Sequence, residues 1–263
     1  MRRNFLILLL GAAVLLLAQR DSKRERPARQ SVRGLRAAVA TGSDYAAEAG
    51  MRLIHKGGNA VDGGVAAMFA ASVSEFSHFG FGGESPVLIR TKDGRVFSIA
   101  GVGPMPKMAS AELFRNRRIL AGELLALEPG GLKGIIPVAG MMPALVPGMV
   151  ESGLVALEEF GMMSFSDVIA PSIDLADGMP LDETRANSIV RSRRFFELWP
   201  TSKTVFTPTG QMPIPGDVFR QPDLARTLRA MAAAEQRALK GGASRREAIN
   251  AVRDFFYRGE IAR

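Results

Sequence analysis

One stretch of the sequence, EFSHFGFGGES at residues 75–85, places a histidine beside a serine and close to a glutamate. His78 could serve as a general base, because an imidazole exchanges its proton near neutral pH. Ser77 and Glu75 are its neighbours in the sequence. A histidine that only forms hydrogen bonds within its own loop explains the same pattern, and we favour that simpler interpretation.

The glycines of this stretch, Gly80, Gly82 and Gly83, have the density of a phosphate-binding loop. Such a loop also needs a cation and a helix that begins directly after the glycines, and neither follows here. We therefore expect a loop whose backbone passes close to a neighbouring segment or lines a cavity for a small substrate.

The other candidates for a nucleophile or a metal ligand have structural explanations. Ser43 and Ser164 precede helical segments, where a serine commonly caps the helix. Thr41 would become an N-terminal nucleophile only after cleavage behind Ala40, and nothing in the sequence marks a processing site there. With no cysteine and two histidines in the chain, we expect no disulfide and no metal.

Two predicted helices lead into the glycine loop. The first runs over 44–56 and ends at Gly57-Gly58, since glycine adopts the left-handed conformation at a helix end without strain. Asn59, with Asp62 three residues later, forms a variant of the capping box and starts the second helix. That helix, over 60–73, is rich in glycine and alanine, so we expect it to be central and buried.

Strands are predicted at 35–40 and in a hairpin over 86–101, whose turn is Lys92-Asp93-Gly94. Residues 121–148 are expected to form a loop with short strands. Helices should dominate from there on, with a proline-rich connection at 200–215. Their predicted ranges are 150–160, 164–177 with an interruption at Pro171, 182–198, 222–240 and 244–257.

The net charge of +8 is concentrated at the start of the chain. Residues 1–36 hold nine of the basic and two of the acidic side chains, so the rest is nearly neutral and we expect no nucleic-acid partner. An apolar run at 4–18 follows two arginines and is shorter than the roughly 20 residues that span a bilayer. We expect 1–19 to be a signal peptide or an anchor through which the protein is attached to the membrane, and 20–34 a basic linker. The protein would then be exported and either periplasmic or membrane-anchored.

Residues 35–263 resemble gamma-glutamyltranspeptidase. The resemblance rests on the order of four segments: KGGNAVDGG at 56–64, GFGGE at 80–84, LVPGMVESGLVALEEFG at 145–161 and SFSDVIAPSIDLADGMPLDE at 164–183. The family consists of N-terminal nucleophile hydrolases, whose αββα sandwich is made as one precursor that cuts itself. The resemblance thus implies an α+β fold, an incomplete αββα sandwich that is helix-rich in its C-terminal half.

In the family, the new N-terminal threonine of the small subunit attacks a gamma-glutamyl amide, with its own amine as base and without any cofactor. No segment after residue 257 matches that subunit, so no catalytic residue is expected in this chain. The resemblance implies a missing or separately encoded small subunit as partner, a small-molecule amide as donor, and a chain that is inactive alone. Without that subunit, we expect the strands and the 60–73 helix to expose apolar faces.

The segment at 100–106 departs from the family pattern DGRETAP. Val102 stands at the position of the arginine that binds the carboxylate of the glutamate, and Gly103 stands at the adjacent glutamate position. We take both as substrate-binding positions. A valine cannot form the charge-assisted contact that selects a carboxylate, so another amide or acyl donor is plausible. A non-catalytic binding module of the cell envelope that keeps the scaffold is the alternative.

Overall fold

A computed structural model describes residues 32–119, 123, 125–127 and 133–262. The predicted leader at 1–19, and most of the linker at 20–34, lie outside these residues. The chain divides into two units, 1–38 and 39–263. No helix among the described residues is long and apolar enough to cross a membrane.

The strand predicted at 35–40 is wrong. In the first unit, residues 32–38 carry no regular structure and Leu35 is fully exposed. Residues 39 and 40, at the start of the second unit, are not in a strand either. A strand is stabilised by hydrogen bonds to a neighbouring strand, and no described strand pairs with this segment.

The two helices before the glycine loop form as the sequence predicts. Helix α2 (Asp44–His55) and helix α3 (Ala60–Ser74) pack along each other at a close crossing. A Cβ atom at Gly50 would lie 2.9 Å from the carbonyl oxygen of Gly63, so a larger side chain there would force the helices apart. The capping box of Asn59 and Asp62 is present at the start of α3.

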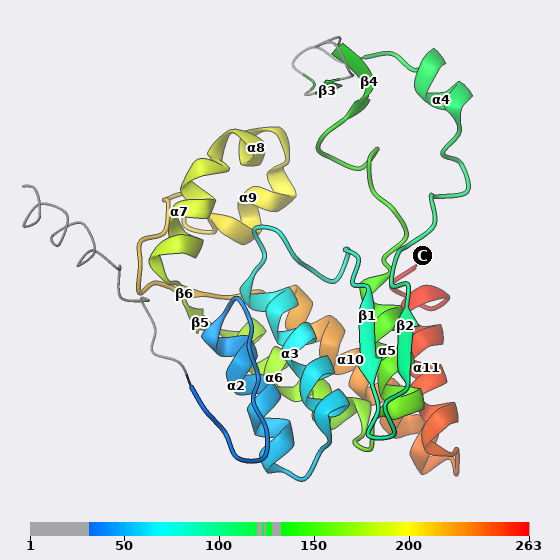
Figure 1. Ribbon diagram of the computed structural model, residues 1–263. Helices are drawn as coiled ribbons and strands as arrows, with labels where there is room; N and C mark the ends of the chain where they lie inside the picture. Colours follow the sequence, from blue (N-terminus) through cyan, green and yellow to red (C-terminus); the bar gives the residue numbers. More distant parts are fainter. Residues whose placement is uncertain (1–31, 120–122, 124, 128–132, 263) are drawn as a thin grey trace, which may run out of the picture. The chain divides into compact units, whose positions relative to one another are not determined.

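Helix α3 lies at the centre of the helical layer, beside α5 (Met149–Phe160) and α6 (Phe165–Asp177) (Figure 1). Helix α10 (Pro222–Lys240) packs against α6, and α11 (Arg245–Tyr257) packs against both α10 and α5. Residues of α3 such as Phe69 and Val73 are fully buried in this core. The expectation that α3 would expose an apolar face is therefore wrong for most of the helix, which α2, α5 and α6 cover, and holds only for the side that carries the exposed Ala60 and Gly64.

A buried carboxylate joins α6 to α10. Glu235 of α10 is 1% exposed, and its two oxygens accept hydrogen bonds from the backbone N–H groups of Phe165 and Ser166 at 2.6 and 2.7 Å. These donors have no partner inside their own helix, so Glu235 completes the start of α6. Helix α6 also continues through Pro171 without the predicted interruption, since packing against α3 and α10 outweighs the lost hydrogen bond.

The hairpin forms as predicted, from β1 (Val87–Arg90) and β2 (Val96–Ile99), and β2 packs against α5 (Figure 1). Ile89 is buried under the hairpin, whereas Leu88 and Val96 are 76% and 63% exposed. The expectation of an exposed apolar face holds only in part for these strands, because Arg90 and Ser98 share the outward face with Leu88 and Val96.

Residues between the hairpin and α5 hold a short helix, α4 (Ala111–Asn116), and two strands, β3 (Leu125–Leu127) and β4 (Lys133–Pro137). The strands were predicted in general terms and α4 was not. The guanidinium of Arg117 donates two hydrogen bonds to the carbonyl oxygen of Ile135 and pairs with Glu123 at 2.8 Å, which ties α4 to β4.

The helix predicted at 182–198 is two helices, α7 (Glu183–Arg191) and α8 (Arg193–Leu198). The chain turns at Ser192 so that Phe196 joins a second apolar cluster. Helix α9 (Pro200–Phe206) occupies part of the predicted proline-rich connection, and β5 (Met179–Pro180) pairs with β6 (Val218–Phe219). The described residues thus have an α+β structure with three separate two-stranded sheets, and the complete sandwich remains a prediction.

Candidate functional site

The glycine loop at 80–85 meets the 101–103 segment, where the resemblance places substrate binding, and the start of α5. The carbonyl oxygen of Gly83 accepts hydrogen bonds from the N–H groups of Gly148 and Met149, both at 3.0 Å. The N–H of Ser85 donates to the carbonyl oxygen of Gly101 at 2.9 Å. The loop thereby completes the start of α5, whose N-cap residue Gly148 has no side chain to do so.

Glycine is required where these backbones touch. A Cβ atom at Gly103 would lie 1.4 Å from the carbonyl oxygen of Val146, and one at Gly148 would lie 2.4 Å from that of Gly101. Gly103 is therefore explained by a backbone contact, which the sequence alone did not show. Gly80 and Gly82 have open space around them, so their predicted place beside a substrate stays a prediction.

Val102 and Gly103 line a cavity of about 330 Å³ beside this junction. The side chain of Val102 is 55% exposed. The other lining residues come from β2 and the segment after it, from the start of α5 and the residues before it, and from the end of α11: Ile99, Gly101, Pro104, Val146, Pro147, Gly148, Glu151, Ser152, Arg253, Tyr257 and Arg258. Sequence reasoning missed the α11 residues, because about 150 positions separate them from Val102.

The cations of this cavity are already paired within the protein. Arg253 lies 2.8 Å from Glu151 and 2.9 Å from Glu158. Burial lowers the pKa of the Arg253 guanidinium, but its hydrogen bonds to Glu158 and Glu151 outweigh this effect and hold the pKa above its ordinary value. Arg258 is exposed and pairs with Asp254 at 2.5 Å. An anion bound in this cavity could therefore pair only with Arg258 at its rim, and Arg258 would first have to release Asp254.

The family model for gamma-glutamyltranspeptidase matches residues 46–263 of the sequence. The chain belongs to the gamma-glutamyltranspeptidase family. It is 30% identical over 208 residues to a glutathione hydrolase-like proenzyme, YwrD, of Bacillus subtilis, covering 77% of this chain and 36% of that protein. It is 31% identical over 213 residues to an acylase proenzyme, ACY 1, of a Pseudomonas species, covering 80% of this chain and 37% of that one. The chain thus spans about a third of the length of these relatives.

Solved structures of the family agree with this assignment. The gamma-glutamyltranspeptidase of Helicobacter pylori matches with a TM-score of 0.68 and 26% identity, over 78% of this chain and 56% of that one. A cephalosporin acylase of Bacillus halodurans matches with a TM-score of 0.68 and 25% identity, over 90% of this chain and 41% of that one. The family membership inferred from the sequence motifs is confirmed.

The remaining candidate residues of this gamma-glutamyltranspeptidase-family chain lie outside the Val102 cavity. His78 contacts Ser77 and Glu75 of its own segment, and these contacts agree both with a loop histidine and with a general base. Ser164 accepts a hydrogen bond from the N–H of Asp167 and caps α6, whereas Ser43 occupies the N-cap position of α2 without a capping hydrogen bond. The hydroxyl of Thr41 donates to the carbonyl oxygen of Ser43 at 2.5 Å. Among the described residues, no cluster of three acidic or histidine side chains could hold a metal ion.

Tyr257 fastens α11 to the start of α5. Its hydroxyl donates to the carbonyl oxygen of Pro147 at 2.5 Å and accepts from the N–H of Glu151 at 3.0 Å. Burial raises the pKa of the Tyr257 phenol to about 12. The phenol therefore stays protonated at neutral pH, and its role is to hold the cavity wall together.

Replacing Tyr257 with phenylalanine should lower the free energy of unfolding by about 1–3 kcal/mol, because two backbone groups lose their partner. Urea unfolding measures this. Tyr45→Phe is the matched control, since the hydroxyl of Tyr45 makes a single exposed hydrogen bond, to Pro180, and its loss should have a much smaller effect. Equal losses in the two variants would contradict the proposed role.

Tyr257→Phe also tests how the stability of the protein depends on pH. A group whose pKa is raised on folding contributes stability that is complete below the pKa of the unfolded chain and is lost as the pH rises through the pKa of the folded chain. For Tyr257 this window lies between about 10 and 12. The wild type should lose stability more steeply there than Tyr257→Phe does.

Proposed function

We propose that this chain is the donor-binding part of an enzyme that transfers or hydrolyses a gamma-glutamyl or related acyl group of a small-molecule amide. The observation that carries the proposal is the position of Val102. It lies in a cavity at the junction of the glycine loop, the 101–103 segment and the start of α5, and the resemblance places the donor-binding arginine of the family there.

The charges of the cavity favour a neutral acyl group over a glutamyl carboxylate. Val102 offers no hydrogen bond, and Arg253 is held by two carboxylates. A carboxylate that entered this cavity would lose water without gaining an unpaired cation, which is unfavourable. The relatives include an acylase and a glutathione hydrolase-like protein. A neutral acyl donor and a gamma-glutamyl donor are therefore both consistent with family membership.

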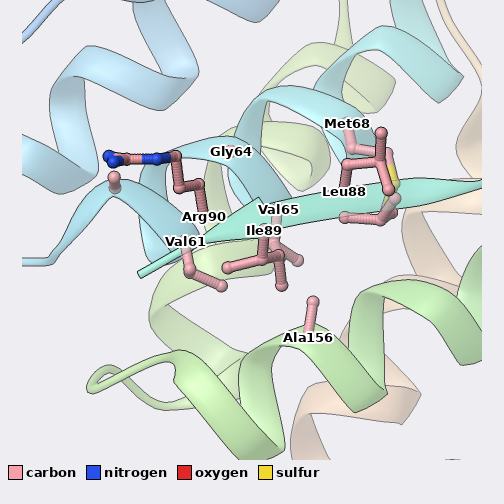
Figure 2. Close-up of a pocket in the computed structure, with 10 residues that line it drawn as sticks. Val61, Gly64, Val65, Met68, Leu88, Ile89, Arg90 and Ala156 are labelled. Atoms are coloured by element: carbon pink, nitrogen blue, oxygen red, sulfur yellow. The ribbon is translucent and has the colours of Figure 1, made fainter. Parts of the chain in front are cut away.

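We further propose that a small subunit carrying the nucleophile packs on the β1–β2 hairpin. Below β1 lies an apolar pocket of about 260 Å³ between α3, β1 and α5 (Figure 2). Val61, Val65 and Met68 line it from α3, and Ala156 lines it from α5. The only described partner of β1 is β2, so its outer edge can take another strand. A strand paired there would cover the exposed Leu88 and fill the pocket.

The proposed function is tested by producing the chain together with a small subunit of the family. The complex is assayed against a gamma-glutamyl anilide and against a neutral acyl anilide of similar size. We expect turnover only by the complex, with the neutral donor preferred. A stable complex with no turnover of either class would overturn the enzymatic proposal in favour of a binding module.

Leu88→Lys should weaken the association of the two subunits, because it places a charge on a face that the small subunit would bury. The amount of small subunit that co-elutes with the chain in size-exclusion chromatography measures the effect, and we expect a loss of at least about tenfold. Leu239→Lys is the control, since Leu239 is an exposed leucine on α10. Full association of Leu88→Lys would place the subunit elsewhere.

A further inference from the structure

The loop between α3 and the glycines holds a chain of three side chains that the function above does not use. The hydroxyl oxygen of Ser77 lies 2.9 Å from Nδ1 of His78. On the other side of the ring, Nε2 of His78 lies 3.2 Å from a carboxylate oxygen of Glu75. The imidazole thus connects a hydroxyl to a carboxylate, which is the arrangement that activates a serine for nucleophilic attack.

The carboxylate end of this chain is fixed. The side chain of Glu75 is only 10% exposed, and Arg185 of α7 lies 3.6 Å from the oxygen that contacts His78. An ionised carboxylate can only accept a hydrogen bond. In the tautomer that carries the proton on Nε2, the ring donates to Glu75 and Nδ1 accepts from the hydroxyl of Ser77.

Ser77 also lines a pocket of about 180 Å³. The other lining residues are aromatic, aliphatic or hydroxylated, and none of them is charged: Phe76, Ser188, Ile189, Ser192, Phe195, Phe196 and Phe206. An apolar cavity of about 150 Å³ is large enough for benzene, so this pocket has room for one ring or a short acyl chain. Ser77 lines this pocket and His78 does not.

This pocket shares no lining residue with the Val102 cavity. Its serine, base, carboxylate and walls all come from α7, α8, α9 and the loop after α3. An activity here would need neither the proposed small subunit nor its nucleophile.

From this geometry we propose that Ser77, His78 and Glu75 form a second reactive site, which hydrolyses activated esters of small, uncharged, apolar carboxylic acids. The hydroxyl oxygen of Ser77 attacks the ester carbonyl carbon while its proton passes to Nδ1 of His78. The bond from the carbonyl carbon to the alcohol oxygen breaks, and that proton leaves with the alcohol.

The acyl group is then bound to Ser77 as an ester. A water molecule gives its proton to Nδ1 and attacks the carbonyl carbon, and the bond to Ser77 breaks. The acid is released and the serine regains its proton. Glu75 stabilises the imidazolium in both steps. Ser188 and Ser192 also line the pocket, and we expect their hydroxyls to donate to the carbonyl oxygen.

The test uses the purified full chain without any small subunit. It is reacted with p-nitrophenyl butyrate and, separately, with a fluorophosphonate probe whose attachment site is mapped by peptide mass spectrometry. We expect the label on Ser77 and an ester hydrolysis rate above that of the buffer. Ser77→Ala should abolish both, and His78→Gln should lower the rate of labelling about 100-fold.

Matched controls separate this site from general surface reactivity. His55 is the other histidine of the chain and is exposed, and Ser98 is exposed on β2, so His55→Gln and Ser98→Ala should react like the wild type. Unfolding curves confirm that each variant is folded. Labelling at another residue, an unchanged rate in Ser77→Ala, or no labelling at all would each overturn the proposal.

Discussion

Replacing Asp62 with alanine is expected to lower the free energy of unfolding by about 3–5 kcal/mol. Asp62 is fully buried. One of its oxygens accepts hydrogen bonds from the N–H groups of Met162 and Met163 at 2.9 and 3.0 Å, and the other accepts from the N–H of Asn59 at 2.8 Å. Alanine would leave these three donors without a partner, and both the start of α3 and the connection between α5 and α6 would lose their anchor.

Urea unfolding of Asp62→Ala, Asp62→Asn and Asp254→Ala decides this. The asparagine variant keeps one acceptor and should lie between the alanine variant and the wild type. Asp254 is an exposed aspartate that pairs with Arg258 on the surface, so its removal should cost less than about 1 kcal/mol. If Asp62→Ala lowered the free energy of unfolding no more than Asp254→Ala does, the hydrogen bonds of Asp62 would not explain the residues of the KGGNAVD segment.

The second large effect concerns the donor. In the assembled enzyme, Val102→Arg should raise the preference for a gamma-glutamyl donor over a neutral acyl analogue by about 10- to 150-fold, because a charge-assisted hydrogen bond contributes about 1.5–3 kcal/mol. More than half of the Val102 side chain is exposed, so an arginine fits there without disturbing the core. The ratio of kcat/KM values for the two donors is the measurement.

Val138→Arg is the control for this substitution. Val138 is 57% exposed, nearly the same as Val102, and it does not line the cavity. It adds the same charge to the protein and should leave the ratio unchanged. If the ratio of kcat/KM values changed equally in both variants, the added net charge would explain the effect. If it changed in neither, Val102 would not be part of the donor site.

The parts of the fold that the sequence predicted are those with local signals. The capping box of Asn59 with Asp62 marks the start of α3 correctly. The turn around Gly94, which has a positive φ of 88°, marks the hairpin. Each of these signals acts within a few residues, so no knowledge of the tertiary structure is needed to interpret it.

The predictions from sequence fail where contacts between residues far apart in the chain determine the structure. Pro171 is tolerated because α3 and α10 support α6 from both sides, and the break at Ser192 places Phe196 in a cluster with residues far along the chain. The same holds for the site. Sequence motifs identified Val102 and Gly103, but nothing local to Arg253 or Tyr257 indicates that α11 forms the opposite wall.

Backbone hydrogen bonds and close backbone contacts join the glycine loop, Gly101, Gly103 and Gly148. The geometry of this junction is therefore independent of the side chain at position 102, which projects from the junction without supporting it. On the proposed function, a substitution at position 102 would change the contact with the donor while the backbone framework of the pocket keeps its shape.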